Sequence, residues 1–277
     1  MRKLLSANFS RLWKDRIFWR VMLGVFIFSL ATILSAVNSV KTMEEIGLIR
    51  TLDDFYFSQA PYMGMFYALF ISLFLGTEYS DGTMRNKLVV GHTRTNVFLA
   101  NFITCFTACL LFVGVWFLGC APGRILIGPF KMGMGEFFTY ALVAVGFTAS
   151  YTAIFTWLGT VYSNKAMTVI RTLGAWLGLI LIASAFNDRL NVPEMQGGMA
   201  YLNGELTMVD PTPDPLYLSG MTRTICEYIL DFLPSGQSIL MNDASISHPI
   251  RQILFSLTLT ALLIPAGVMC FGRKNIK

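Results

Sequence analysis

The sequence predicts an all-α integral membrane protein with six transmembrane helices, and three observations indicate this fold class. Hydrophobic residues make up 55% of the 277 residues and charged residues only 13%, whereas about a quarter of a soluble domain is charged. Six mainly apolar segments approach or exceed the roughly 20 residues that a helix needs to cross the hydrocarbon core. Segments such as VGVWFLGC do not alternate apolar and polar residues with the period of two that a transmembrane β-barrel requires.

The expected spans organise the whole chain, residues 1–277, as a single transmembrane domain. They lie at residues 20–37, 61–76, 97–120, 136–161, 167–186 and 250–271, and Pro61 and Gly64 shorten the uninterrupted part of the second. Residues 1–19 form an interfacial helix, residues 20–186 hold the first five spans, residues 187–249 form an extracellular loop, and residues 250–277 form the last span and a cytoplasmic tail.

The distribution of basic residues predicts the orientation of the spans. With the N-terminus inside, the cytoplasmic segments carry 14 Lys and Arg against 3 Asp and Glu, and the rest of the chain carries 7 against 13. We therefore expect a multi-pass protein of the cell membrane with both termini in the cytoplasm. The net charge of +5 follows from this topology and gives no reason to expect a nucleic-acid partner.

Residues 4–17 predict an amphipathic helix that lies in the membrane interface. Leu5, Phe9, Leu12 and Trp13 share one helical face, and basic residues such as Lys14 lie largely elsewhere. The alternative is that these residues are an ordinary cytoplasmic extension of the first span.

The large outer loop divides into two halves. Its first half is rich in glycine and proline and predicts an irregular loop. In its second half, Ile225, Ile229 and Phe232 recur at helical spacing until Pro234, which predicts a short helix, a break and a second short segment before the last span.

The chain shows no pattern that is typical of an enzyme. It has no phosphate-binding loop, no HExxH and no GxSxG motif, and its five cysteines lack the spacing of metal ligands. We therefore expect no catalytic residue, no metal site and no cofactor in this chain.

Few ionisable residues lie within the spans, which argues against an ion-coupled secondary carrier. Arg171 lies about one turn inside the fifth span and is expected either to anchor the helix at the inner surface or to act as a gate. The sequence shows no mid-membrane cluster of Asp, Glu or His of the kind that such a carrier uses to bind an ion.

A polar stretch, EYSDGTMRNKLVVGHTR, separates the second and third spans. Asp81 or Ser80 is expected to cap a helix from Gly82 to Val90, Gly91 to end it, and Thr93 or Thr95 to cap the third span. Met84 and Leu88 share one face of this helix, and Arg85 and Lys87 point elsewhere. Because a two-turn helix is unstable in water, it is expected either to dock on a cytosolic partner or to lie on the lipid surface.

This stretch, GTEYSDGTMRNKLVVGHTRTNVFLANFI, resembles the inner loop of ABC transporter permeases of the type-two exporter class. Its segments RNKL and VGHTR are similar to the corresponding segments of permeases found beside antimicrobial-peptide and drug-export ATPases in Gram-positive bacteria. The ending FGRKNIK resembles the basic C-terminus of that family, although Asn275 stands where an aspartate is frequent. With six spans and a large last outer loop, the resemblance covers essentially the whole chain.

The resemblance implies the permease subunit of an ATP-driven exporter in a bacterial cell membrane, which moves a peptide, a drug or a lipid-like molecule outward. Its partners would be two copies of a cytosolic ATP-binding subunit, which holds ATP and Mg²⁺, and a second, identical or related permease. The coupling helix would be Gly82–Val90, and the residues that couple it to the ATPase would be Glu78, Asp81, Gly82, Thr83, Met84, Arg85, Lys87, Leu88 and Arg94. A membrane sensor or an immunity component that does not transport remains the alternative.

Overall fold

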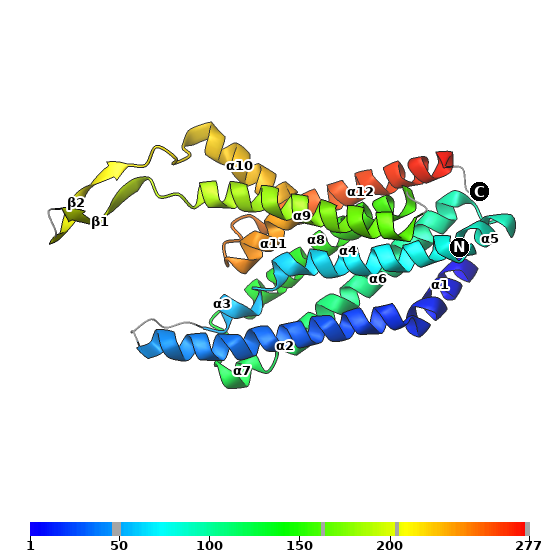
Figure 1. Cartoon of the computed structure of the whole chain (residues 1–277), viewed down its shortest axis with the longest axis horizontal. Helices are drawn as coiled ribbons and strands as arrows, with labels where there is room; N and C mark the ends of the chain where they lie inside the picture. The colour runs from blue at the N-terminus through cyan, green and yellow to red at the C-terminus, as the bar shows by residue number, and fades with distance from the viewer. Residues whose placement is uncertain (46–50, 162–163, 203–204, 275–277) are drawn as a thin grey trace.

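The fold, seen in a computed structural model, is that of an all-α membrane protein with one small β-hairpin (Figure 1). The structure describes the chain except for residues 46–50, 162–163, 203–204 and 275–277, and it describes the backbone but not the side chains of 197–202 and 205–210. Six helical segments are long and apolar enough to cross a membrane. Their helices are α2 (Arg16–Glu45), α4 (Ala60–Ser80), α6 (Arg94–Cys120), α8 (Met134–Val161), α9 (Lys165–Leu190) and α12 (Pro249–Arg273).

The six long helices run side by side, and the short elements collect at the two ends of the bundle (Figure 1). The terminal end holds both chain termini, α1 (Arg2–Lys14) and α5 (Thr83–Val89). The hairpin end holds α3 (Asp53–Tyr56), α7 (Gly123–Leu126) and the strands β1 (Met195–Leu202) and β2 (Glu205–Pro213). Between α9 and α12 at that end lie α10 (Gly220–Phe232) and α11 (Pro234–Asn242).

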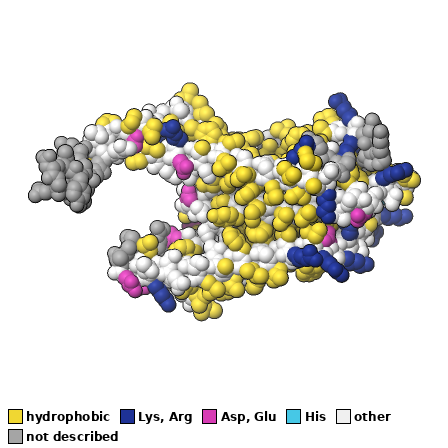
Figure 2. Space-filling view, viewed as in Figure 1, with side chains coloured by type: hydrophobic (Ala, Val, Ile, Leu, Met, Phe, Trp, Pro, Cys, Tyr) yellow, Lys and Arg dark blue, Asp and Glu magenta, His cyan; other side chains and the backbone are white. Residues whose placement is uncertain are grey.

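Helices α4 and α8 form the centre of the bundle. In the most apolar 18 residues of each, 61% are buried, whereas only 11% are buried in the corresponding stretches of α9 and α12. The core between them is aromatic, with Tyr67, Phe70, Phe147 and Tyr151 fully buried. The two outer helices therefore present most of their apolar side chains to the surroundings, and an apolar band covers the middle of the molecule (Figure 2).

Pro61 and Gly64 do not interrupt the second span, contrary to the expectation. Pro61 lies in the first turn of α4, where a missing N–H costs no hydrogen bond. At Gly64 an added Cβ would lie 2.5 Å from the indole ring of Trp176 on α9, so the glycine allows this ring to pack close to the α4 backbone.

Several helices extend beyond the expected spans because helix formation does not stop where hydropathy falls. Helix α2 continues to Glu45, through residues expected in a loop from 38 onward, and α4 continues to Ser80 instead of ending near Gly76. Neither extension contains a proline, so nothing in the backbone chemistry ends these helices early.

The prediction of an irregular loop in the first half of residues 187–249 is wrong for β1 and β2. The two strands pair antiparallel, with Gly198 opposite Val209 and Leu202 opposite Glu205, and an irregularity lies between Gln196 and Gly198. Glycine and proline weaken a strand inside a sheet. In a two-stranded ribbon both strands are edges, so the prolines of β2 are tolerated.

The second half of this segment contains the two expected short elements. Helix α10 ends at Phe232, and Pro234 begins α11 instead of only interrupting the chain. The expected apolar face of α10 does not pack inward, because Ile225 is 52% exposed and the buried residues are Cys226, Leu230 and Asp231.

Candidate functional site

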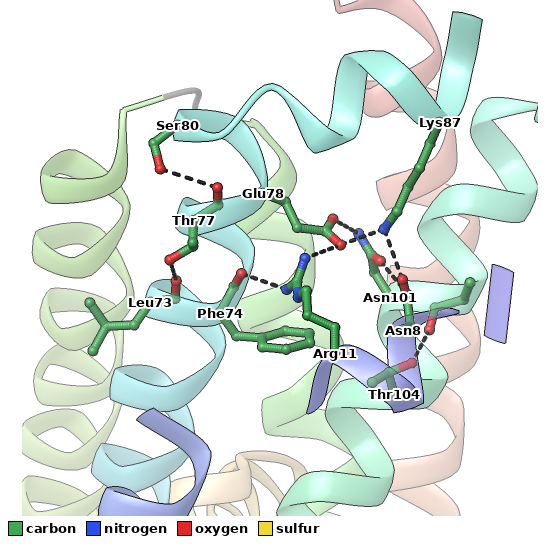
Figure 3. A network of polar contacts seen from close by, with 11 residues as sticks. Asn8, Arg11, Leu73, Phe74, Thr77, Glu78, Ser80, Lys87, Asn101 and Thr104 are labelled. Carbon is green, nitrogen blue, oxygen red and sulfur yellow. Dashed lines mark hydrogen bonds and ion pairs between the residues drawn. The ribbon is translucent and has the colours of Figure 1, made fainter. Parts of the chain in front are cut away.

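A buried carboxylate organises the terminal end of the bundle. Glu78 lies in the last turn of α4 with its side chain fully buried, and it forms ion pairs with Arg11 of α1 and Lys87 of α5. Asn101 of α6 donates a hydrogen bond of 3.0 Å from Nδ2 to the other carboxylate oxygen. One carboxylate therefore joins four helices (Figure 3).

A second layer of hydrogen bonds closes this arrangement. Asn8 of α1 donates to Asn101 Oδ1 at 2.8 Å and accepts from Lys87 Nζ at 2.8 Å. Arg11 donates to the carbonyl oxygen of Phe74 at 2.8 Å, and its guanidinium lies 3.7 Å from the centre of the Phe74 ring. We call Asn8, Arg11, Glu78, Lys87 and Asn101 the Glu78 cluster.

The Glu78 cluster places charges where water is largely excluded. Burial lowers the pKa of Lys87, and the adjacent Glu78 carboxylate counteracts this shift. Removing one partner of a buried ion pair leaves an uncompensated charge and typically costs about 3–5 kcal/mol. The cluster therefore holds α1 and α5 firmly against the long helices.

Glycines, not side-chain caps, set the bounds of α5. Gly82 precedes α5 in the left-handed region with φ of 69°, and neither Asp81 nor Ser80 caps the helix as expected. Gly91, with φ of 95°, ends it as expected, and its N–H bonds to the carbonyl of Leu88. Thr93 caps α6 as expected, because its hydroxyl accepts a hydrogen bond of 3.3 Å from the backbone N–H of Asn96.

The apolar ridge of α5 packs inward, so it does not form the partner-facing surface that the sequence suggested. Met84 is 1% exposed, and both Met84 and Leu88 pack in a small core with Leu4 and Phe271. The exposed face consists of Arg85, Asn86, Val89 and Val90, and the two valines are 76% and 77% exposed. We call these four residues the α5 face.

The other predicted coupling residues have different environments. Asp81 is exposed, and Thr83 is half-buried at the start of α5. Arg94, in the first turn of α6, donates from Nη1 to the carbonyl oxygens of Phe271 at 2.8 Å and Gly272 at 3.1 Å, and also to that of Lys274. Arg94 thus holds the last turn of α12 and does not belong to the α5 face.

The residue after α12 is also fixed to the bundle. Lys274 donates from Nζ to the carbonyl oxygen of Thr160 at 2.8 Å and lies 3.9 Å from the centre of the Tyr79 ring. Burial lowers the pKa of Lys274 from its usual value of 10.5 to about 8. The end of α12 therefore contacts both α8 and α4.

Helix α1 is separate from α2, which excludes a plain extension of the first span. The helical conformation is interrupted at Asp15, which has an extended backbone. Its carboxylate accepts a hydrogen bond of 2.7 Å from the backbone N–H of Ile17. The packed face is Leu4, Asn8 and Leu12, so of the predicted interfacial residues only Leu12 is fully buried. Leu5 and Phe9 are half-buried, and Trp13 is 51% exposed.

Arg171 lies in the second turn of α9 and is half-buried. It belongs to a helix that packs against α4, α8 and α11. Its role as a gate stays a prediction.

The sequence interpretation missed Asn8, Arg11 and Asn101 as partners of Glu78. The available signal was Asn101, a polar residue inside the apolar segment VFLANFI, because a buried amide needs hydrogen-bond partners.

Among the described residues, no group of three or more His, Cys, Asp or Glu side chains forms a metal site. No protein-family model and no curated protein matches the chain.

Proposed function

We propose that this chain is the membrane-spanning permease subunit of an ATP-driven ABC exporter. A separate ATP-binding subunit, present in two copies, would hold ATP and Mg²⁺, and a second permease would complete the assembly. The observation that carries the proposal is the construction of α5. This helix is anchored by a buried ion pair on one side and exposes adjacent valines and an arginine on the other.

Transmission of force through α5 requires that the helix does not unfold or slide when a partner pushes it. A helix of seven residues has almost no stability of its own. Here Met84 and the Lys87–Glu78 pair fix it to α4 and α6. A displacement of α5 would therefore move the spans with it.

The α5 face suits a protein partner with an apolar groove. Val89 and Val90 offer a small apolar contact, and Arg85 beside them offers a cation. Arginine is enriched among the residues that dominate protein interfaces, and the two valines would add apolar area that excludes water around it. The lipid surface, the alternative for this helix, would instead bind it through unspecific charge attraction.

Charge asymmetry supports the orientation that the proposal needs. Lys and Arg gather at the terminal end, and Asp and Glu gather toward the hairpin end (Figure 2). The excess of basic residues on cytoplasmic segments would place the terminal end, with both termini and α5, in the cytoplasm of the cell membrane. An ATPase in the cytosol would then reach α5.

The test is a pull-down of the tagged full chain from its native host in mild detergent, with the bound proteins identified by mass spectrometry and assayed for ATP hydrolysis. We expect a stoichiometric partner that carries a phosphate-binding loop. The double variant Arg85→Glu, Val89→Glu changes only the exposed face and should lose this partner while the chain still inserts. Leu88→Glu is unsuitable because Leu88 packs in the core.

The matched control is Arg124→Glu, Ile125→Glu on α7, which makes the same charge change at exposed residues of the hairpin end. It should retain the partner. A wild-type chain that is isolated without an ATPase in several detergents would contradict the proposal and favour the sensor or carrier interpretation.

A further inference from the structure

A polar hollow lies at the hairpin end, on the opposite end of the bundle from α5. It has a volume of about 190 Å³ and lies between the last turn of α9, helix α10, and the loop that leads into α12. The side chains that decide its chemistry are Asn187, Arg223, Glu227, Asp231, His248 and Arg251.

The charges in the polar hollow balance. Arg251 pairs with Asp231, and Arg223 pairs with Glu227 one turn away at 3.3 Å. The side chain of Asp231 is only 4% exposed, and its carboxylate also accepts a hydrogen bond of 2.6 Å from the side-chain amide of Gln252. Arg223 and Glu227, at 36% and 39%, remain open to a ligand.

Two apolar grooves continue from the polar hollow along α10 and α12. The first groove shares Arg251 with the polar hollow and runs past Leu254 to Phe255. The second shares Phe255 with the first and is lined by Ile229 and Phe232 of α10. The polar hollow and the two grooves are therefore contiguous through shared side chains.

The grooves open toward the region where lipid chains would lie. Leu254 is 57% exposed and Ile225 52% exposed, so both side chains lie open within the described part of the chain. The polar hollow lies at the end of α9 and the start of α12, where a bilayer changes from hydrocarbon to headgroups. The Arg251 guanidinium lies 4.3 Å from the centre of the Tyr228 ring. Tyrosine side chains are enriched at the membrane–water interface.

We propose that the polar hollow and its two grooves bind one membrane phospholipid with a zwitterionic headgroup. Arg251 and Arg223 face the phosphate, and Glu227 faces the ammonium group. One acyl chain lies in each groove, and both chains contact Phe255. A headgroup with both charges matches a hollow with both charges, whereas an anionic headgroup would leave a carboxylate against it unpaired. This inference goes beyond the proposed function and does not depend on it.

The test uses the purified full chain and native mass spectrometry in detergent, with phosphatidylethanolamine and phosphatidylglycerol of identical acyl chains in competition. We expect the chain to retain the ethanolamine lipid roughly tenfold more than the glycerol lipid, the equivalent of about one charge-assisted contact. Arg223→Gln, Glu227→Gln should abolish this preference. Its matched control, Arg124→Gln, Glu136→Gln, neutralises an exposed pair of charges at the same end and should keep it.

A second pair of variants tests the grooves without removing apolar surface. Leu254→Trp fills the first groove and should lower retention of either lipid at least about tenfold. Leu262→Trp places the same bulk on the same helix at a side chain that is 63% exposed and lines neither groove, so retention should not change. Equal retention of the two lipids, or equal behaviour of the two tryptophan variants, would overturn the proposal. A lipid-free dimer that Leu254→Trp alone dissociates would also overturn it and assign the grooves to a second copy.

Discussion

The two ends of the bundle each contain a buried carboxylate, but the two networks connect different parts of the chain. Glu78 joins α1, α4, α5 and α6, and the contacts of its cluster include a pair 93 residues apart in the sequence. Asp231 joins α10 to α12 through partners only 20 and 21 residues away. The first network connects helices that are far apart in the sequence, whereas the second connects two helices that are close in the sequence.

The two networks also differ in how completely their charges are enclosed. Glu78 faces two cations and an amide, and its side chain is fully buried. Asp231 faces one cation, Arg251, whose side chain is 22% exposed at the edge of the polar hollow. The enclosed network suits the transmission of force that we propose, and the partly open network leaves room for the lipid headgroup that we propose.

The largest expected effect is on Glu78. Glu78→Gln leaves Arg11 and Lys87 close together without their carboxylate, and we expect a loss of about 3–5 kcal/mol in the free energy of unfolding. The measurement is unfolding in detergent micelles by SDS titration. Glu136→Gln, at an exposed position in the first turn of α8, should change stability by less than about 0.5 kcal/mol.

A smaller effect is expected at the hairpin end. Asp231→Asn keeps a hydrogen-bonding side chain opposite an arginine that water can reach, so the same titration should show a loss of about 1–3 kcal/mol. A loss as large as that of Glu78→Gln would show that the two networks are equally enclosed.

The two networks should also differ in the coupling energy between their paired side chains. In a double-mutant cycle of Glu78→Gln and Lys87→Met, we expect a coupling energy of about 1–3 kcal/mol, because the pair is buried. The cycle of Arg223→Gln and Glu227→Gln should give about 0.3–0.5 kcal/mol, as for an exposed pair one helical turn apart. Similar coupling energies in the two cycles would contradict the assignment of an enclosed and an open network.

The smallest expected effect is a pH dependence at the terminal end. The pKa of Lys274 is lowered to about 8 by burial, so between pH 8 and about 10.5 the unfolded chain binds more protons than the folded one. Stability should therefore rise with pH across this window. Below pH 8, Lys274 is charged in both states, so its destabilising contribution is fully present and does not change with pH. Thermal unfolding of the wild type and of Lys274→Met at several pH values measures this contribution. The stability of the wild type relative to the variant should be constant below pH 8 and increase from pH 8 to about 10.5, and a wild type that shows no such increase would contradict the prediction.

Much of the fold could be predicted from the sequence, because hydropathy alone identifies segments that must be helical in a bilayer. The ends of the helices could not, since α2 and α4 outlast their apolar segments. The hairpin was missed because its glycines and prolines are typical of loops as well as of edge strands.

The site was predictable only in part. The end of α5 at Gly91 follows from local chemistry, and Glu78 was expected only from the family resemblance. The direction of the Met84–Leu88 ridge follows from neither. A short amphipathic helix packs its ridge against whichever apolar surface is nearest, and here that surface belongs to α1, α6 and α12. Asn8, Arg11 and Asn101 lie far from Glu78 in the sequence, so only the packing of separate helices brings them together.

The position of Arg94 has a consequence for the order in which the protein assembles. Its acceptors are the carbonyl groups of residues 177 to 180 positions later in the chain. At a translation rate of about 5–20 residues per second, Arg94 leaves the ribosome roughly 9–36 s before its acceptors do. Asn101 is the last residue of the Glu78 cluster in the sequence. The cluster can therefore form before the rest of the chain has been synthesised. The terminal end is complete only when α12 has been inserted, because Arg94 at the start of α6 then finds its acceptors at the end of α12.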